Sequence, residues 1–340
     1  IPLDSKRKMD LTIDTYGYDI DRVSYEVRSL DTQRKIADTK INDWSKDKNT
    51  WTKSLQIENL VDEGEEYLFI LKLHCGSENL YYYTRITLPE ETYAKKCLEF
   101  TDQFHDVSMS DQYETLASYL EPSEYTDKND LGSVGIDSSI DQIGWRGFNG
   151  TQIGKPLVSF TDINDTYASL VYTYQMEEQN DGVSTYYNVE EYYKVRYTDL
   201  QIYLLDYKRT MEQIVDVAAV GVSGNKLGVG ITNGDIQYLS NETGTIVSFV
   251  QAGELFTYNQ NKQTFTKVFG FVDDPTDVRQ NYGQHNIRIL NIDETGNMDF
   301  VVYGYMNRGE HEGESGINLY HYDSIKQEAI EQVFISTTHS

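Results

Sequence analysis

A run of oxygen-bearing side chains in the last third of the sequence has the spacing of a cation-binding loop. Asn291, Asp293, Thr295 and Asp299 occupy relative positions 1, 3, 5 and 9, and Gly296 occupies position 6. Alternate side chains of a tight loop can converge on one point, and a glycine at the sixth position lets the backbone reverse. An apolar run follows at once. The pattern predicts a calcium-type loop that leads into a β-strand.

The charge of this loop limits what it can bind. Only two of the four oxygen-bearing side chains are acids, whereas Ca²⁺ prefers several anionic oxygens. We therefore predict weak calcium binding through Asn291, Asp293, Thr295 and Asp299, and the sequence indicates no other cofactor. The alternative is a turn held by hydrogen bonds from the Asp, Asn and Thr side chains, with no metal.

A polar loop between two expected strands is the second candidate for ligand contact. Residues 306–316 contain Arg308, His311 and three glutamates, including Glu312, among three glycines. Loops at the end of a sheet often carry binding residues. We predict that Arg308, His311 and Glu312 contact a ligand, and the alternative is a flexible charged connection. The loop is not a zinc-binding His-Glu-x-x-His motif, because Ser315 stands at the second histidine position.

The sequence lacks the motifs of common enzyme classes. There is no Gly-x-Ser-x-Gly nucleophile motif, and the glycine-rich stretch 221–230 lacks the Gly-Lys-Ser/Thr of a phosphate loop. With 55 acidic residues, a pair of carboxylates suited to glycoside hydrolysis arises easily by chance. His285, just before an expected strand, is interpreted as a structural residue. We therefore assign no catalytic residue.

The elements that must position these loops are short strands along most of the chain. Runs rich in β-favouring residues alternate with Asp, Asn, Gly and Ser clusters, and the 28 tyrosines suit half-buried sheet faces. Residues 92–121 differ, because their spacing is helical and places Tyr93, Cys97 and Phe100 on one face. A second helix is expected from Ser110 to Leu120. This segment predicts a helical connector packed against the second domain.

Residues 60–67 read Leu-Val-Asp-Glu-Gly-Glu-Glu-Tyr. The leucine, turn glycine and tyrosine resemble the corner before a late strand of fibronectin type III domains, with a spacing one residue longer. In such corners the tyrosine hydroxyl bonds back to the backbone. The resemblance implies that residues 1–91 form a fibronectin- or immunoglobulin-like β-sandwich with a spacer or adhesion role.

The rear of the chain contains related segments. Hairpins expected at 253–269 and 316–334 both open on glycine, pass through alternating residues to aromatics and return through Val-Phe. Residues 162–174 repeat the 291–303 pattern without its glycine. The 291–299 loop and its strand resemble the repeats of integrin-type β-propellers. The resemblance implies a propeller-like antiparallel β domain over residues 130–340, in which the ring need not be complete, after a helical connector at 92–129.

Composition narrows the partners. The net charge of −26 disfavours nucleic acid and anionic lipid, and no apolar run is long enough to cross a membrane. The first residue is Ile1, which we interpret as a sign of a mature or trimmed chain. Cys75 and Cys97 belong to no metal motif and are expected as free buried thiols, with a disulfide as the alternative.

These observations predict a mostly β, extracellular or cell-surface-anchored protein that binds a protein or a glycan without transforming it. It would bind no nucleic acid and would not insert directly into a membrane. Two alternatives remain open. One is a propeller-based carbohydrate-active enzyme with acids among Asp162, Glu310 and Glu312, and the other is the sensor ectodomain of a membrane protein.

Overall fold

The structure is a computed structural model, and it is mostly β, with 54% of residues in strands and 8% in helices. It describes residues 1–57, 61–88, 93–124, 130–164, 166–198, 200–223, 226–232, 235–275, 277, 280 and 282–337. Among those residues no helix has the length and apolar character needed to cross a membrane.

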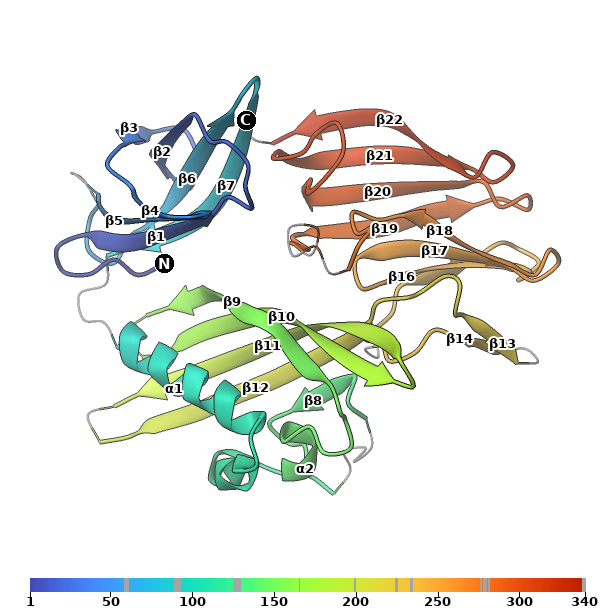
Figure 1. Ribbon diagram of the computed structural model, residues 1–340, viewed down its shortest axis with the longest axis horizontal. Coiled ribbons are helices and arrows are strands. Elements are labelled where there is room, and N and C mark those ends of the chain that lie inside the picture. The colour runs from blue at the N-terminus through green and yellow to red at the C-terminus, as the bar shows by residue number, and fades with distance from the viewer. Residues whose placement is uncertain are drawn as a thin grey trace.

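The N-terminal unit consists of two antiparallel sheets that face one another across one core (Figure 1). Their strand orders are β1-β5-β4 and β3-β2-β6-β7. The strands are β1 (Lys8–Asp14), β2 (Arg22–Ser29), β3 (Lys35–Ile41), β4 (Ser45–Asp47), β5 (Thr50–Gln56), β6 (Glu66–Cys75) and β7 (Glu78–Thr87). Ile13 from the first sheet and Val27 and Phe69 from the second are buried together, because their strands alternate apolar and polar residues.

The corner before β6 is tied by its tyrosine. The hydroxyl oxygen of Tyr67 accepts the backbone N–H of Asp62 at 3.1 Å and donates to the Asp62 carboxylate at 3.2 Å. Gly64 adopts φ 78°, a conformation that glycine reaches without strain. The expected bond from tyrosine hydroxyl to backbone is therefore present, and Leu60 lies outside the described residues.

The middle unit is a five-stranded antiparallel sheet covered on one face by a helix (Figure 1). Its strand order is β8-β12-β11-β10-β9. Its elements are α1 (Ala94–Ser108), η1 (Tyr113–Tyr119), β8 (Ser133–Gly135), α2 (Ile140–Ile143), β9 (Thr151–Ile163), β10 (Ala168–Asn180), β11 (Val183–Tyr197) and β12 (Ile202–Gln213).

The expected connector helices belong to this middle unit. Cys97, Phe100 and Phe104 of α1 share a core with β10, β11 and β12. The first helix is confirmed and extends to Ser108, beyond the stretch whose spacing predicted it. The second segment is a seven-residue 3₁₀ helix, although Ser110 Oγ accepts the N–H of Gln112 as a cap would.

The C-terminal region contains two successive four-stranded sheets and a short two-stranded arm. The arm pairs β13 (Gly221–Ser223) with β14 (Lys226–Gly228). The first sheet comprises β15 (Tyr238–Ser240), β16 (Ile246–Gln251), β17 (Glu254–Asn259) and β18 (Thr264–Phe269). The second comprises β19 (His285–Ile292), β20 (Met298–Tyr305), β21 (Ser315–Asp323) and β22 (Glu328–Ser336). Both sheets follow sequence order. The two expected hairpins, β17–β18 and β21–β22, thus occupy the same place in each sheet.

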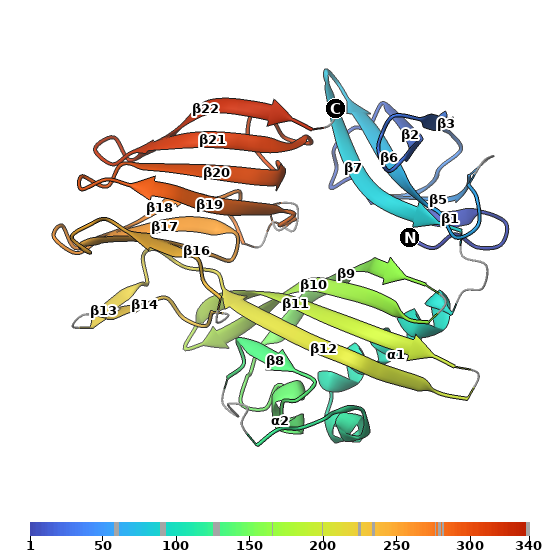
Figure 2. The same cartoon turned by 180° about the vertical axis from the view of Figure 1, so that it is seen from behind.

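The five sheets with three or more strands form a propeller-like ring (Figure 2). The ring is not built from residues 130–340 alone, because the N-terminal sheets complete it. It closes between β7 and the loop after β20. The rings of Tyr82 and Tyr305 lie 6.1 Å apart there, and a Cβ on Gly313 would lie 3.0 Å from Leu80 Cδ2. Contacts between residues so distant in sequence leave no local pattern.

Candidate functional site

A cavity of about 1670 Å³ lies inside the ring. Each of the five sheets of the ring contributes to its lining, through Thr12 of β1, Leu73 of β6, Thr173 of β10, Val250 of β16 and Tyr303 of β20. Ordinary small-molecule sites measure roughly 300–1,000 Å³. The cavity therefore has room for a segment of a polymer.

The outer face of the five-stranded sheet forms one side of the cavity, which we call the cavity floor. It consists of Thr173, Gln175, Asn188, Glu190, Thr210 and Glu212. Strand pairing places Glu190 between Thr173 and Thr210 in one row and Asn188 between Gln175 and Glu212 in the next. Successive side chains of a strand point to opposite faces. The neighbouring residues Tyr174, Val189 and Met211 accordingly pack under α1, and the floor is polar.

Aliphatic side chains, tyrosines and acids make up most of the rest of the lining. The tyrosines that line the cavity away from the five-stranded sheet include Tyr16, Tyr18, Tyr82, Tyr282, Tyr303 and Tyr305. The lining acids are Asp14, Asp19, Glu78, Glu190, Glu212, Asp235 and Glu312, against Lys155 and Arg308 as the basic side chains. Tyr18 and Tyr303 are exposed by 60% and 42%. Both side chains are therefore partly exposed, and the excess of acidic side chains gives the cavity negative charge.

The structure brings two of the three predicted ligand residues to this cavity. Arg308 and Glu312 both line it, and Arg308 Nη1 donates to Glu312 Oε1 at 3.4 Å. His311 lies apart from the lining. Its ring stacks on Phe334 with centroids 3.8 Å apart, and its Nε2 lies 3.0 Å from Glu331 Oε1. The 306–316 loop therefore presents only part of the predicted set to the cavity.

The acids considered for a carbohydrate-active enzyme do not converge. Of Asp162, Glu310 and Glu312, only Glu312 lines the cavity. Asp162 lies near the end of β9, where its Oδ2 accepts the hydroxyl of Tyr167 at 2.7 Å. Glycoside hydrolysis needs two carboxyl groups facing one another across the bound sugar. The arrangement of these three acids gives that chemistry no support.

His285 lines the cavity, and its ring contacts other parts of the protein. Its Nε2 lies 2.9 Å from the carbonyl oxygen of Gly253, to which it donates, and its ring packs edge-on against Phe271. Burial lowers the pKa of His285, and the hydrogen bond to Gly253 acts in the opposite direction. The neutral imidazole therefore links β19 to the turn before β17.

The 291–299 loop is a network of side-chain hydrogen bonds. Asp293 Oδ1 accepts the N–H of Thr295 at 2.8 Å, the hydroxyl of Thr295 at 2.7 Å and the N–H of Asn297 at 2.9 Å. Asn291 Nδ2 donates to Asp299 Oδ2 at 2.8 Å, and Asp299 Oδ1 lies 2.7 Å from His321 Nδ1. The loop donors hold the pKa of Asp293 below its ordinary value despite the opposing effect of burial.

This geometry separates the predicted calcium ligands into two groups. Asp293 and Thr295 serve the turn, whereas Asn291 and Asp299 pair across β19 and β20. Within the described part of the chain no cluster of three or more His, Cys, Asp or Glu residues is suited to a metal ion. The turn without metal accounts for the spacing, and calcium binding stays a prediction.

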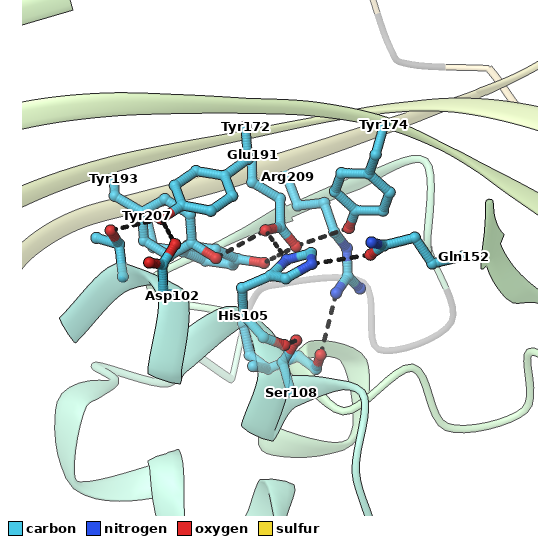
Figure 3. Close-up of polar contacts among 12 residues, drawn as sticks. Asp102, His105, Ser108, Gln152, Tyr172, Tyr174, Glu191, Tyr193, Tyr207 and Arg209 are labelled. Carbon is cyan, nitrogen blue, oxygen red and sulfur yellow. Dashed lines mark hydrogen bonds and ion pairs between the residues drawn. The ribbon is translucent and has the colours of Figure 1, made fainter. Parts of the chain in front are cut away.

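A second polar feature lies on the opposite face of the five-stranded sheet, beneath α1 (Figure 3). The carboxylate of Glu191 on β11 is fully buried. His105 Nδ1 lies 2.8 Å from Glu191 Oε2, and the hydroxyl of Tyr193 donates to the same oxygen at 2.7 Å. The hydroxyls of Tyr174 and Tyr207 donate to Oε1 at 2.9 and 3.3 Å. Four donors thus satisfy one buried anion.

Opposite charges stabilise the ionised form of this pair. Burial acts to raise the pKa of Glu191, but the hydrogen bond and charge of His105 and the charge of Arg209 lower it below its ordinary value. Burial acts to lower the pKa of His105, and Glu191 raises it above its ordinary value. Both directions describe an imidazolium–carboxylate ion pair.

Arg209 adds a second buried cation near the same carboxylate. Its guanidinium donates to the backbone carbonyls of Ile143 at 3.0 Å and Gln142 at 2.6 Å, and it stacks 3.5 Å over Trp145. The side chain is fully buried. It therefore joins α2 to β12 and contributes positive charge to the core without contacting the cavity.

Sequence reasoning missed the cluster around Glu191, although a signal existed. Tyr187, Val189, Tyr193 and Val195 alternate along β11 and are all buried, and Glu191 stands in the same phase. An acid on the buried side of a strand needs hydrogen-bond donors or an opposite charge in the core. Of the tyrosines near Glu191, Tyr187 and Tyr193 are accordingly packed inside.

The two cysteines are free and lie in different units. Cys97 is buried in α1, and burial raises its pKa to about 11. Cys75 is half-buried on β6, and burial and the acids Asp21 and Glu78 raise its pKa. Raised values leave little thiolate at neutral pH, so neither side chain is an activated nucleophile.

No model of a known protein family matches the chain, and no curated protein matches it either.

Proposed function

We propose that this protein is a non-catalytic binding or scaffold protein of the cell surface, which holds its protein or glycan ligand in the central cavity. The observation that carries the proposal is the lining of that cavity. Five sheets contribute to it, its floor offers hydroxyl, amide and carboxylate groups, and exposed tyrosines belong to the rest of its lining. Such a combination of aromatic faces and polar groups suits the recognition of extended ligands.

The proposal includes the two family resemblances found in the sequence, the fibronectin-type module and the integrin-type repeats. The N-terminal unit would act as a fibronectin-type sandwich that completes the ring, and the strand order and the Tyr67 hydroxyl bond support this. The two C-terminal four-stranded sheets would be diverged integrin-type repeats, supported by the equivalent positions of their hairpins. Placement outside the cell rests on the sequence alone, as does the role of a sensor ectodomain.

The proposal can be tested with a cavity-filling variant. Thr173→Trp places a large side chain on the cavity floor, whereas Thr39→Trp makes the same change on the exposed strand β3, outside the cavity lining. The parent would first be screened against a glycan array and a phage-displayed dodecapeptide library. We expect the selected ligands to bind Thr39→Trp as they bind the parent and to bind Thr173→Trp at least about tenfold more weakly.

The contrary outcome is equally clear. If ligands bind both tryptophan variants with parental affinity, and both variants melt as the parent does, the cavity is not the binding site. If no ligand is selected from either library, the proposed binding function loses its support.

A further inference from the structure

We propose that the ligand of the central cavity is a basic peptide segment, one whose lysine or arginine side chains enter the cavity. The inference deepens the proposed function and rests on it. A glycan chain is the competing class, and the test below separates the two.

The balance of charge in the lining is the first argument. Seven acidic side chains line the cavity, against two basic ones. Arg308 lies 3.4 Å from Glu312 and 3.9 Å from Asp277, so the lining charges of Arg308 and Glu312 offset one another. Six lining acids then remain against Lys155. A concave surface lined by one sign of charge concentrates its field and attracts the opposite sign. The cavity therefore favours cationic ligands and opposes anionic ones.

The position of the acids on the floor is the second argument. Glu190 is exposed, and no ion pair or hydrogen bond engages its side chain among the residues that the structure describes. Strand pairing flanks it with the hydroxyls of Thr173 and Thr210. A neutral sugar could offer hydroxyl donors to this carboxylate but no opposite charge. An ammonium or guanidinium group would instead pair with it.

The aromatic side chains supply the third argument. The rings of Tyr303, Tyr82 and Tyr18 are part of the lining and are partly exposed. The face of an aromatic ring attracts a cation, because the ring quadrupole places negative charge there. The chain already uses this contact elsewhere, with Lys194 Nζ 4.1 Å from the Tyr167 ring and Lys96 Nζ 4.3 Å from the Tyr197 ring. A basic peptide can thus use both the acids and the rings of one cavity.

The test measures binding of three fluorescein-labelled decapeptides to the full chain by anisotropy. One alternates Lys with Ser, one replaces Lys by Gln, and one replaces Lys by Glu. The variant Glu190→Gln/Glu212→Gln removes two floor charges while keeping an acceptor for the N–H of Ala252, which Glu212 binds at 2.9 Å. The matched control, Glu242→Gln/Glu328→Gln, removes two exposed charges outside the lining.

The expected result has three parts. The lysine peptide binds more tightly than the glutamine peptide, and the glutamate peptide does not bind. The floor variant weakens binding of the lysine peptide about 3- to 30-fold, the range expected for two exposed ion pairs, whereas the control variant stays within about twofold. Added salt weakens binding to the parent more than binding to the floor variant.

Other outcomes separate the inference from the proposed function. If the lysine and glutamine peptides bind equally, or if floor and control variants behave alike, the inference is wrong. If neutral oligosaccharides bind and Thr173→Trp blocks them while the lysine peptide fails, the binding function stands with a glycan as ligand. If Thr173→Trp affects no ligand, the proposed function itself fails.

Discussion

The imidazole Nδ1 of His105 and the carboxylate Oε2 of Glu191 lie 2.8 Å apart, and both side chains are buried in the core. The contact joins α1 to β11, the central strand of the five-stranded sheet. A buried ion pair is costly to break, because removal of one partner leaves the other charged and desolvated. Glu191 therefore decides how firmly the helix is held against the sheet that carries the cavity floor.

The first prediction concerns Glu191 itself. Glu191→Gln keeps the side-chain shape but removes the charge that balances His105 and Arg209, so it should lower the free energy of unfolding by roughly 3 kcal/mol. Urea denaturation followed by circular dichroism measures the change. The control is Glu190→Gln on the same strand, which faces the cavity and should change stability by less than about 0.5 kcal/mol. Equal effects of the two variants would contradict the assigned roles.

The second prediction concerns pH. The raised pKa of His105 adds stability that is complete below its ordinary value of 6.5 and is lost as pH rises through the folded value. The lowered pKa of Glu191 adds stability that is complete above its ordinary value of 4.5 and is lost as pH falls through the folded value. The stability difference between parent and Glu191→Gln should therefore be largest between pH 4.5 and 6.5.

The groups around this pair support that window. The hydroxyls of Tyr174, Tyr193 and Tyr207 stay protonated there, because burial, the largest cause, raises the pKa of each. Arg209 stays charged, since a guanidinium is not deprotonated in proteins. Urea unfolding at a series of pH values gives the profile. A His105→Gln variant that keeps the parental loss of stability above pH 6.5 would show that another group causes it.

The third prediction concerns the 291–299 loop. Asp293→Ala removes the acceptor of several loop donors and should lower stability by about 1–2 kcal/mol whether calcium is present or not. The turn without metal also predicts that the melting temperature of the parent is flat across millimolar calcium. A calcium-dependent rise in the parent that disappears in both Asp293→Ala and Asp299→Ala would instead establish the metal site.

The fourth prediction concerns closure of the ring. Gly313 adopts φ 89° and Gly309 φ 91°, so alanine at either position carries the same backbone strain. A Cβ on Gly313 would meet Leu80 of β7, whereas one on Gly309 would meet nothing within 4 Å. Gly313→Ala should therefore cost roughly 1–3 kcal/mol more than Gly309→Ala, as overpacking does.

Small-angle scattering supplies the structural measurement for the same pair. If Gly313→Ala separates β7 from the β20–β21 loop and opens the ring, its radius of gyration will exceed that of the parent, and Gly309→Ala should leave it unchanged. An identical scattering curve and identical stability for both variants would show that the ring does not close at this contact.

Local patterns in the sequence predicted the elements well. Short strands separated by turn residues were expected along most of the chain, and β1 and β2 are two of them, because alternation and turn residues are local signals. The helix that begins near Tyr93 was predicted from the same kind of evidence. The related hairpins at 253–269 and 316–334 were recognised because both open on glycine, pass through alternating residues to aromatics and return through Val-Phe.

Long-range relationships were not predictable from the sequence. Ring closure depends on Tyr82 and Tyr305, and the buried ion pair depends on His105 and Glu191. The pairing of Tyr82 with Tyr305 leaves no local pattern. The alternation along β11 marks Glu191 as buried but does not identify His105 as its partner. The 306–316 loop was predicted to contact a ligand through Arg308, His311 and Glu312. Arg308 and Glu312 line the cavity, whereas the ring of His311 stacks on Phe334, and the ligand contact stays a prediction. The cavity floor was missed, since its polar residues resemble any solvent-facing sheet.

The most direct test of the account is photo-cross-linking from the cavity floor. A benzoylphenylalanine would replace Thr173 in one protein and Thr39 in another, and each would be irradiated with the tightest ligand from the glycan and peptide screens. The account predicts that position 173 captures the ligand and position 39 does not. Capture from position 39 alone, or from neither position while binding persists, would contradict it.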